Sequence, residues 1–149
     1  MSDNCPEFYG DFENIPIDTK GRLIVPAAFR NALPSGVSSV IVTQWFDGCL
    51  AAFDPDGWRR IIDQLRNMGH SQVQSRQLVR AMAGRASEVK LDRQGRALIP
   101  RKRLDSVGIT DRATLAGAVE CIEIWDPDRY NEAQNAVNME EIAEGLERY

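Results

Sequence analysis

The sequence has few residues from which a metal or disulfide site could be built. Its 149 residues include three cysteines and one histidine, His70. The cysteines, Cys5, Cys49 and Cys121, are odd in number and none belongs to a C-x-x-C pair, so the sequence predicts neither a disulfide framework nor a zinc site. We expect no bound metal or cofactor. We also expect Cys49 and Cys121 to be buried packing residues, because free cysteine is among the most buried residue types.

The sequence also lacks the short motifs that many enzymes carry. It contains no G-x-S-x-G motif, no P-loop and no spacing of metal ligands, and no pattern pairs its carboxylates. The single histidine follows Gly69 at a predicted turn between helices, where we expect it to be exposed. The sequence therefore favours a protein that is not an enzyme and has neither catalytic residues nor a small-molecule substrate, although a fold alone does not exclude catalysis.

Long apolar runs are absent as well. No stretch approaches the roughly 20 residues of a membrane-spanning helix, so we expect no membrane contact. The N-terminal MSDNCPEFYGDFENIP is acidic and lacks the basic and then apolar layout of a secretory signal, which predicts a cytoplasmic protein. With 43% hydrophobic residues and a net charge of only −4, the chain has the composition of a folded protein.

The charges are unevenly distributed along the chain. Residues 76–103 contain nine Lys/Arg and two Asp/Glu, whereas residues 1–75 carry a net charge of −3 and residues 104–149 a net charge of −8. Phosphate groups respond to charge within a Debye length of about 8–10 Å, so a basic block on an acidic chain could bind DNA with one face. The alternative is that Arg76, Arg80 and Arg85 form a solvated helix face.

An internal repeat organises the chain. Residues 18–30, DTKGRLIVPAAFR, match residues 92–104, DRQGRALIPRKRL, at an offset of 74 residues, and CLAAFDPDGW at 49–58 matches CIEIWDPDRY at 121–130 at an offset of 72. Two matches in the same order with nearly equal offsets indicate two copies of one unit. We expect a first unit over 8–84, including a closing and a linking helix, and a second unit with a C-terminal helix over 85–149.

Each copy has the same predicted order of elements: two short strands, a short helix after a proline, a β-hairpin and a longer helix after an Asp-Pro pair. In the first copy they cover residues 14–18, 23–25, 26–34, 37–44, 49–53 and 55–69, followed by a linking helix over 71–83. In the second copy they cover residues 88–92, 97–99, 100–108, 113–116 and 121–125, with a helix from 127 onward. Pro16 removes a hydrogen-bond donor from the first strand, which predicts an edge position.

A D-x-x-G-R turn follows the first strand of each copy. Glycine at the third loop position supplies the positive φ that such a hairpin loop needs, and the aspartate can accept hydrogen bonds from loop amides. A salt bridge from the aspartate to the arginine would fix the guanidinium for bidentate recognition of phosphate or guanine. The alternative is that this pair only braces the hairpin. The residues concerned are Asp18, Gly21 and Arg22 in the first copy and Asp92, Gly95 and Arg96 in the second.

The sequence of a strand, a D-x-x-G-R turn, three apolar residues, a proline and a short helix resembles the AbrB/SpoVT-type swapped-hairpin DNA-binding fold. Two such units, each with an aromatic-Asp-Pro helix entry, and the opening Phe8-Tyr9-Gly10 resemble the MraZ family over roughly residues 8–147. The resemblance implies an α+β fold in which two fused AbrB/SpoVT-like units form a small pseudo-twofold barrel, of the double-psi or swapped-hairpin type, with flanking helices.

The same resemblance implies a function. MraZ proteins are transcriptional regulators that bind repeated DNA boxes upstream of the division and cell-wall gene cluster, including their own promoter, and assemble as rings. We therefore expect a sequence-specific, nucleoid-associated protein that binds double-stranded DNA as a homo-oligomer. Carried over by position, the expected DNA contacts are Arg22, Arg96, Lys20 and Arg93, with Asp18, Gly21, Asp92 and Gly95 as positioning residues. The two loop cations do not align with each other, so we expect the two turns to contribute unequally.

Two further features are left open. Arg101, Lys102 and Arg103 begin the short helix of the second copy, where they could contact DNA as a secondary basic patch or form salt bridges with the acidic C-terminal helix of another subunit. The acidic segment 131–149 could instead be the tail of an AbrB-type, antitoxin-like module whose main partner is another protein. A large ring favours the MraZ interpretation, and a small oligomer that copurifies with a second protein favours the alternative.

Overall fold

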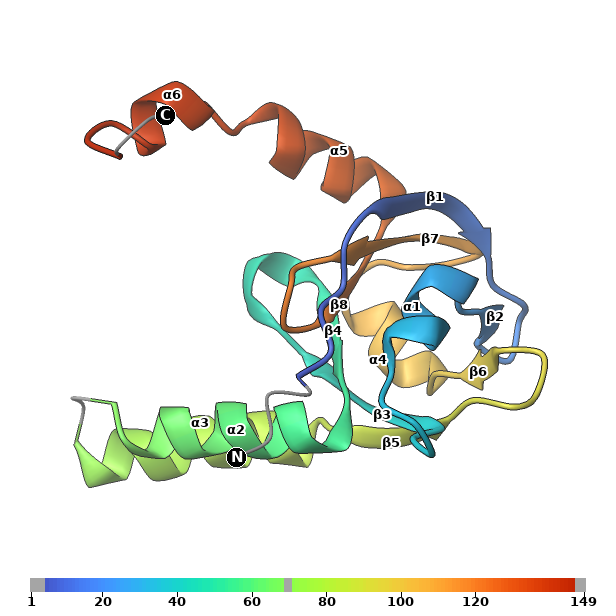
Figure 1. Ribbon diagram of the computed structural model, residues 1–149, viewed down its shortest axis with the longest axis horizontal. Helices are drawn as coiled ribbons and strands as arrows, with labels where there is room; N and C mark the ends of the chain where they lie inside the picture. Colours follow the sequence, from blue (N-terminus) through green and yellow to red (C-terminus); the bar gives the residue numbers. More distant parts are fainter. Residues whose placement is uncertain (1–4, 69–70, 147–149) are drawn as a thin grey trace.

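The structure is a computed structural model that describes residues 5–68 and 71–146 (Figure 1). Within these residues, two β-sheets form the body of the molecule, and helices from both repeats pack on it or extend from it. His70 lies outside the described residues, so its exposure stays a prediction.

The elements of both repeats follow the predicted order. Those of the first are β1 (Asp11–Pro16), β2 (Arg22–Ile24), α1 (Ala27–Ala32), β3 (Ser39–Gln44), the 3-10 turn η1 (Phe46–Gly48), β4 (Leu50–Phe53), α2 (Pro55–Arg66) and α3 (Gln72–Gly84). Those of the second are β5 (Ser87–Lys90), β6 (Arg96–Leu98), α4 (Arg101–Ser106), β7 (Arg112–Gly117), β8 (Ile122–Trp125), α5 (Pro127–Asn135) and α6 (Met139–Ile142). The expected single C-terminal helix is therefore two helices, because Asn138 caps a new one.

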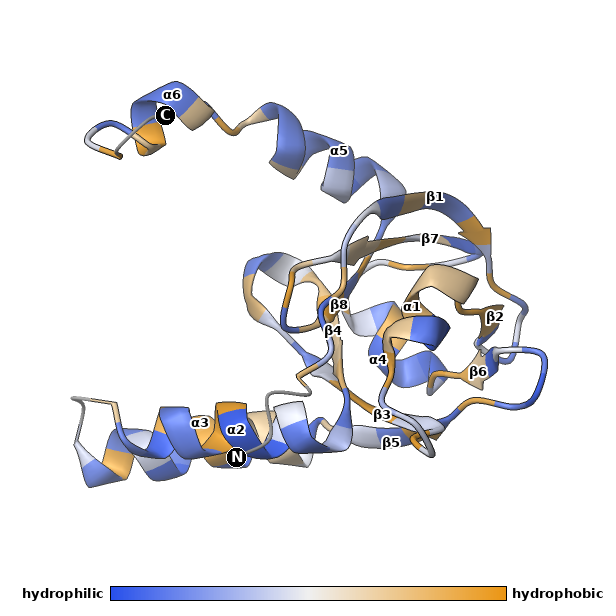
Figure 2. Ribbon diagram, viewed as in Figure 1, coloured by the Kyte–Doolittle hydropathy of each residue, from blue (hydrophilic) through white to orange (hydrophobic). Residues whose placement is uncertain are grey.

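Local sequence sets where the long helices begin. Asp54 and Asp126 each accept a hydrogen bond from the N–H of the third residue beyond them, at 3.2 and 3.1 Å, which confirms the Asp-Pro helix starts. Ser71 begins α3 with a capping box. Figure 2 shows α2 and α3 side by side below the sheets, where Ile62 and Leu65 are buried with Met82 in one apolar cluster.

Hydrogen bonding joins the strands across the repeats. The larger sheet has the order β1-β7-β8-β4-β3-β5, so the first strand of each repeat pairs with the hairpin of the other, and the smaller sheet pairs β2 with β6. The prediction that the strands flanking each D-x-x-G-R turn form a hairpin holds only next to the turns. The Asp18 N–H donates to the Arg22 carbonyl and the Asp92 N–H to the Arg96 carbonyl, both at 3.0 Å, and Leu91 bridges Ala97, but β1 pairs with β7 and β5 with β3. The chain enters the first turn already bound to the second repeat, since the Ile17 N–H donates to the Asp111 carbonyl at 2.8 Å. This exchange fits the swapped-hairpin resemblance.

The two sheets enclose one core without closing into a barrel. β1 and β5 remain the edges of the six-stranded sheet, with β2 in contact with one edge strand and β6 with the other. Backbone pairing within the described residues therefore does not close the barrel that the resemblance led us to expect. The edge position of β1 confirms the expectation from Pro16, whose missing N–H would interrupt an inner strand.

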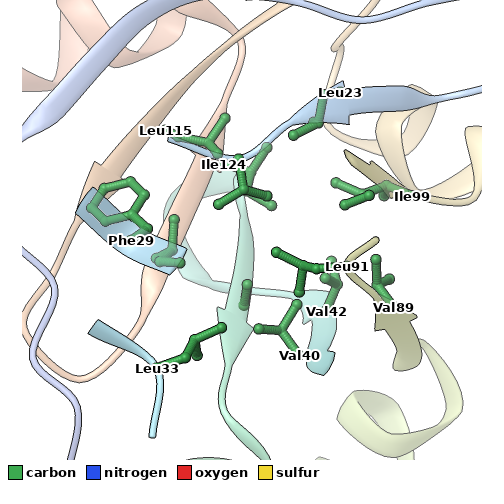
Figure 3. Close-up of a pocket in the computed structure, with 14 residues that line it drawn as sticks. Leu23, Phe29, Leu33, Val40, Val42, Val89, Leu91, Ile99, Leu115 and Ile124 are labelled. Carbon is green, nitrogen blue, oxygen red and sulfur yellow. The ribbon is translucent and has the colours of Figure 1, made fainter. Parts of the chain in front are cut away.

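The core contains a small void that does not qualify as a ligand site. The core encloses a cavity of about 20 Å³. Figure 3 shows the side chains that line it, all of them apolar, among them Leu23, Val42, Ile99 and Leu115. A ligand pocket needs a few polar groups to orient its occupant, and a cavity without them also stays free of water. This cavity is a packing void shared by the two repeats.

Two of the cysteines belong to the packed interior. Cys49 and Cys121 are buried, as predicted, and Cys5 is exposed. Burial raises the pKa of the Cys121 thiol to about 12 and raises the pKa of Cys49 as well, so both thiols stay protonated at neutral pH. In the part of the chain that the structure describes, no helix has the length and apolar character that a membrane crossing requires.

Gly21 and Gly95 tie each turn to the other repeat. The Gly21 carbonyl accepts a hydrogen bond from the Ile99 N–H at 3.0 Å, and the Gly95 carbonyl accepts one from the Val25 N–H at 2.9 Å. Both glycines have a positive φ, +98° and +82°. Their surroundings differ, because a Cβ on Gly21 would collide with the carbonyl oxygen of Ile99 whereas a Cβ on Gly95 would collide with the side chain of Arg30.

We predict that Gly21→Ala destabilises the protein more than Gly95→Ala. Both substitutions place a Cβ at positive φ, which costs about 1–2 kcal/mol, but only Gly21→Ala must also displace backbone, at Ile99 just after β6. The free energy of unfolding, measured by urea denaturation, should fall by about 1–2 kcal/mol for Gly95→Ala and by at least about 3 kcal/mol for Gly21→Ala. Equal losses would show that the Ile99 contact is not the cause.

Candidate nucleic-acid interface

The two D-x-x-G-R turns have the same hydrogen bonds. In the first, Asp18 Oδ1 accepts from the backbone N–H groups of Lys20 and Arg22, both at 2.9 Å, and Oδ2 accepts from Arg22 Nε at 2.8 Å. In the second, Asp92 makes the equivalent bonds to Gln94 and Arg96, with Nε at 2.6 Å. The pre-oriented arginine that the sequence predicted is therefore present in both repeats. Among the described residues, Nε is the only guanidinium nitrogen of either arginine that donates to a protein group. The Nη groups of both arginines therefore make no hydrogen bond to these residues.

These hydrogen bonds keep both carboxylates ionised. Donation from the Arg22 backbone N–H is the largest cause that lowers the pKa of Asp18, and the Arg96 backbone N–H does the same for Asp92. A carboxyl whose pKa is lower in the folded state stabilises the fold above its unfolded pKa and loses this contribution only as the pH falls through the folded pKa. The pairs are therefore intact at neutral pH and open only in acid.

The two arginines lie on one face of the β2–β6 ribbon. Arg22 is opposite Leu98 and Ile24 is opposite Arg96, so side-chain alternation directs all four outward while Leu23 and Ala97 point into the core. Arg22 and Arg96 are diagonal neighbours, a relation that places residues about 7–8 Å apart. Both arginines line one surface groove.

Ile24 and Leu98 are part of this face, and the sequence prediction missed them. They are 55% and 53% exposed, although both belong to the apolar triplets that follow the turns. The alternation of side-chain direction along a strand was the available signal. When the first and third residues of each apolar triplet point into the core, the middle residue must point outward. The outer face of the ribbon thus combines two cations with two apolar side chains.

Lys20 and Arg93 lie at the loop tips. Both residues are exposed, and because β2 and β6 are antiparallel, their turns stand at opposite ends of the ribbon. The structure therefore brings Arg22 and Arg96 together and sets the two loop cations to either side of them.

The Arg101-Lys102-Arg103 triplet does not form one basic patch. Arg101 Nη2 donates to the carbonyls of Ile109 and Thr110, both at 2.6 Å, and Arg101 Nε pairs with Asp105 at 3.1 Å. Because four hydrogen bonds are made within the chain, including a long one to the Asp18 carbonyl at 3.4 Å, Arg101 braces its own subunit. Arg101 and Arg103 are partly buried, and only Lys102 of the three is exposed. Arg101 is thus engaged within its own chain, and the contact of the triplet with DNA or with another subunit stays a prediction.

Arg30 is a second internal brace that sequence reasoning did not identify. Its Nε donates to the Val25 carbonyl at 2.9 Å, and its side chain packs against Gly95 of the other repeat. Arg101, on α4, thus contacts the first turn, and Arg30, on α1, contacts the second turn. The two arginines do not occupy equivalent positions of the repeat. The contacts of Arg101 with the Asp18 carbonyl and of Arg30 with Gly95 join residues distant in sequence, so no local pattern could have revealed them.

The remaining polar groups do not suggest other chemistry. Residues 5–68 and 71–146 contain no cluster of three His, Cys, Asp or Glu side chains that could hold a metal ion. The ribbon can instead bind anions and base edges, because it presents two fixed guanidinium groups beside apolar surface on an exposed face.

We predict that Arg101→Ala and Lys102→Ala differ sharply in their effect on stability. Arg101→Ala leaves the Ile109 and Thr110 carbonyls without their donors, so the free energy of unfolding should fall by about 1–3 kcal/mol. Lys102→Ala removes only an exposed side chain and should change it by less than about 0.5 kcal/mol. Thermal or urea unfolding measures both, and equal effects would mean that Arg101 does not brace the chain.

Comparison with known proteins places the chain in a family. The family model described as "MraZ protein, putative antitoxin-like" matches it twice, over residues 8–81 and 82–149. The chain is 37% identical over 131 residues to the transcriptional regulator MraZ of Roseiflexus castenholzii, covering 88% of this chain and 89% of that protein. Identity is 34% to the protein of the same name from Lachnoclostridium phytofermentans, with coverage of 95% and 96%, and 32% to that from Lactiplantibacillus plantarum, with coverage of 93% and 97%. The chain therefore belongs to the MraZ family.

Proposed function

We propose that this protein is a transcriptional regulator that binds double-stranded DNA sequence-specifically, as a ring of many copies. Its targets would be repeated boxes upstream of the division and cell-wall gene cluster, including its own promoter, so that it acts at the nucleoid. The observation that carries the proposal is the shared face of Arg22 and Arg96, to which each repeat contributes one fixed guanidinium. Relatives with 32–37% identity are named transcriptional regulators, which supports the assignment.

The shape and chemistry of the ribbon suit the major groove. A two-stranded β-ribbon fits that groove, and arginine there binds guanine O6 and N7 bidentately. Ile24 and Leu98, exposed beside the arginines, can contact thymine methyl groups, which are the apolar feature of the same groove. Lys20 and Arg93, at the ends of the ribbon, are placed to contact phosphates.

Assembly supplies the affinity that a single chain lacks. One ribbon with its two loops offers about two to four phosphate contacts, and affinity at physiological salt is built from more contacts than that. Copies joined in a ring present several ribbons to one DNA, so each later contact forms at a high effective concentration. Repeated boxes are the target that such an array of identical ribbons requires.

We predict that Arg22→Ala together with Arg96→Ala removes specific binding while leaving the fold intact. Each bidentate contact contributes about 1–3 kcal/mol, so the loss of two should lower affinity for DNA from upstream of the protein's own gene at least about thirtyfold. The salt dependence of log K should become shallower by about 0.9 for each phosphate that the variant no longer neutralises. Fluorescence anisotropy at two salt concentrations measures both quantities.

Arg59→Ala is the matched control for this variant. Arg59 is an exposed arginine on α2, so its loss changes the charge but leaves the ribbon intact, and affinity should stay within about twofold of wild type. All variants should unfold within about 1 kcal/mol of wild type, because exposed salt bridges contribute little to stability. Unchanged DNA binding by the double variant would remove both arginines from the proposed site.

We also predict that Asp18→Asn weakens DNA binding even though it makes the protein less acidic. Asparagine can still accept from the loop amides, but its Nδ2 cannot accept from Arg22 Nε, so the guanidinium loses its fixed orientation. If only net charge mattered, the substitution would strengthen binding. A loss of about threefold or more, measured on the same DNA, is expected from the loss of an ion pair worth up to about 1 kcal/mol.

Asp111→Asn separates orientation from charge. Asp111 is an exposed aspartate near the same end of the ribbon, where its carbonyl binds the Ile17 N–H, and its carboxylate lies 4.0 Å from Arg112. This control removes the same charge without freeing Arg22, so DNA affinity should stay equal or rise slightly. Tighter binding by both variants would mean that Asp18 does not position Arg22.

A further inference from the structure

A basic groove lies between α2 and α3, away from the ribbon. Its lining residues are Arg66, Gln72, Ser75, Arg76, Val79 and Arg80. The three arginines are exposed, and none of them forms a salt bridge within the described residues. α3 itself contains no acidic residue. We call this surface the helix-pair groove.

The C-terminal arm, residues 136–146, has the complementary character. It carries three carboxylates and no basic residue, and its large apolar side chains are exposed: Met139 by 76%, Ile142 by 74% and Leu146 by 68%. The arm contains a helix of only four residues, α6. Isolated helices this short are not stable in water, because too few hydrogen bonds offset the cost of forming the first turn. The helix therefore needs a surface to pack on.

The arm and the groove lie at separate places on one chain. Figure 1 shows α5 and α6 leaving the sheets near β1 and β7, whereas α2 and α3 leave them near β3 and β5, with open space between the two projections. Two complementary surfaces at different places on the same chain form a head-to-tail contact, which closes into a ring when the rotation between copies allows it.

We propose that the C-terminal arm of one copy binds in the helix-pair groove of the next copy, with Glu140, Glu141 and Glu144 facing Arg66, Arg76 and Arg80. The exposed apolar side chains of the arm then cover Val79 and the exposed Val73 of α3. The inference deepens the proposed function, since it identifies the contact that would build the assembly. Charge complementarity decides the occupant: the arm brings three carboxylates and apolar surface to a groove that offers three guanidinium groups and apolar surface.

DNA is the competing occupant of the groove, and the structure favours it less. The helices α2 and α3, which carry the groove, and the strands β2 and β6, which form the ribbon, lie on opposite sides of the molecule in Figure 1, so DNA bound at the ribbon and an occupant of the groove contact different parts of the chain. DNA binding at the groove would also leave the apolar side chains of the arm uncovered. A second copy covers both surfaces with one contact.

Two charge-reversed proteins test the proposal. The arm variant carries Glu140→Lys, Glu141→Lys and Glu144→Lys, and the groove variant carries Arg66→Glu, Arg76→Glu and Arg80→Glu. All six positions are exposed, so both variants should fold, which circular dichroism and thermal unfolding would verify. Size-exclusion chromatography with light scattering, without DNA, should show that each variant alone loses the high mass of the wild-type assembly.

Mixing the two variants is the decisive step. The basic arm of the first then meets the acidic groove of the second, and the acidic arm of the second meets the basic groove of the first, so an equimolar mixture should recover the wild-type mass with alternating copies. Recovery also excludes misfolding as the reason why each variant alone has a low mass. A wild-type chain that runs as a monomer, a variant that keeps the wild-type mass by itself, or a mixture that stays dissociated would each overturn the proposal.

Two further measurements keep this proposal separate from the proposed function. The variant lacking both Arg22 and Arg96 should keep the wild-type mass, so its loss of DNA binding cannot arise from a broken assembly. If the groove variant kept its mass and instead lost DNA affinity, the groove would contact DNA and the interface assignment would be overturned. A wild-type chain of low mass that holds a second protein through the arm would overturn it as well.

Discussion

The hydrogen bonds from Ile99 to the Gly21 carbonyl and from Val25 to the Gly95 carbonyl determine the geometry of the whole site. Each fixes a turn of one repeat against the residue that follows β2 or β6 of the other, and the glycine of each turn has a positive φ. Because the bonds are exchanged between repeats, the two turns cannot move independently of the ribbon that they flank. The relative position of Arg22 and Arg96 is therefore a property of the fold and does not depend on either repeat alone.

The Asp–Arg pairs have a role that stability does not explain. Both pairs are about half exposed on the arginine side, and exposed ion pairs typically contribute between zero and about 1 kcal/mol. The carboxylate nevertheless satisfies two backbone amides and fixes the guanidinium at Nε in both repeats. Bracing and positioning are thus not alternatives here, since the same carboxylate shapes the loop and orients the arginine. The fixed orientation of the guanidinium is the feature that would favour ligand binding.

Local patterns in the sequence predicted what local forces control. The repeat offsets, the Asp-Pro helix starts and the Asp–Arg pairing are set within a few residues, and the structure contains all of them. The hairpin prediction failed beyond the turns because pairing of β1 with β7 depends on residues about a hundred positions away. The contact of Arg101 with the Asp18 carbonyl was missed for the same kind of reason, whereas its bonds to the Ile109 and Thr110 carbonyls depend on how the chain folds back after α4. Ile24 and Leu98 could have been found, because strand alternation alone directs them outward.

The basic block at 76–103 shows why charge along a sequence is a poor guide to charge on a surface. Folding separates it into three places: Arg76 and Arg80 line the helix-pair groove, Arg96 lies on the ribbon, and Arg101 is used inside the chain. The ribbon regains a matching cation from Arg22 and the groove gains Arg66, both from the acidic N-terminal half. Two separate basic surfaces result, one beside apolar side chains on a ribbon that fits a DNA groove and one on a helix pair that fits an acidic arm. The proposed function requires both surfaces, because a surface occupied by a neighbouring copy cannot also hold DNA.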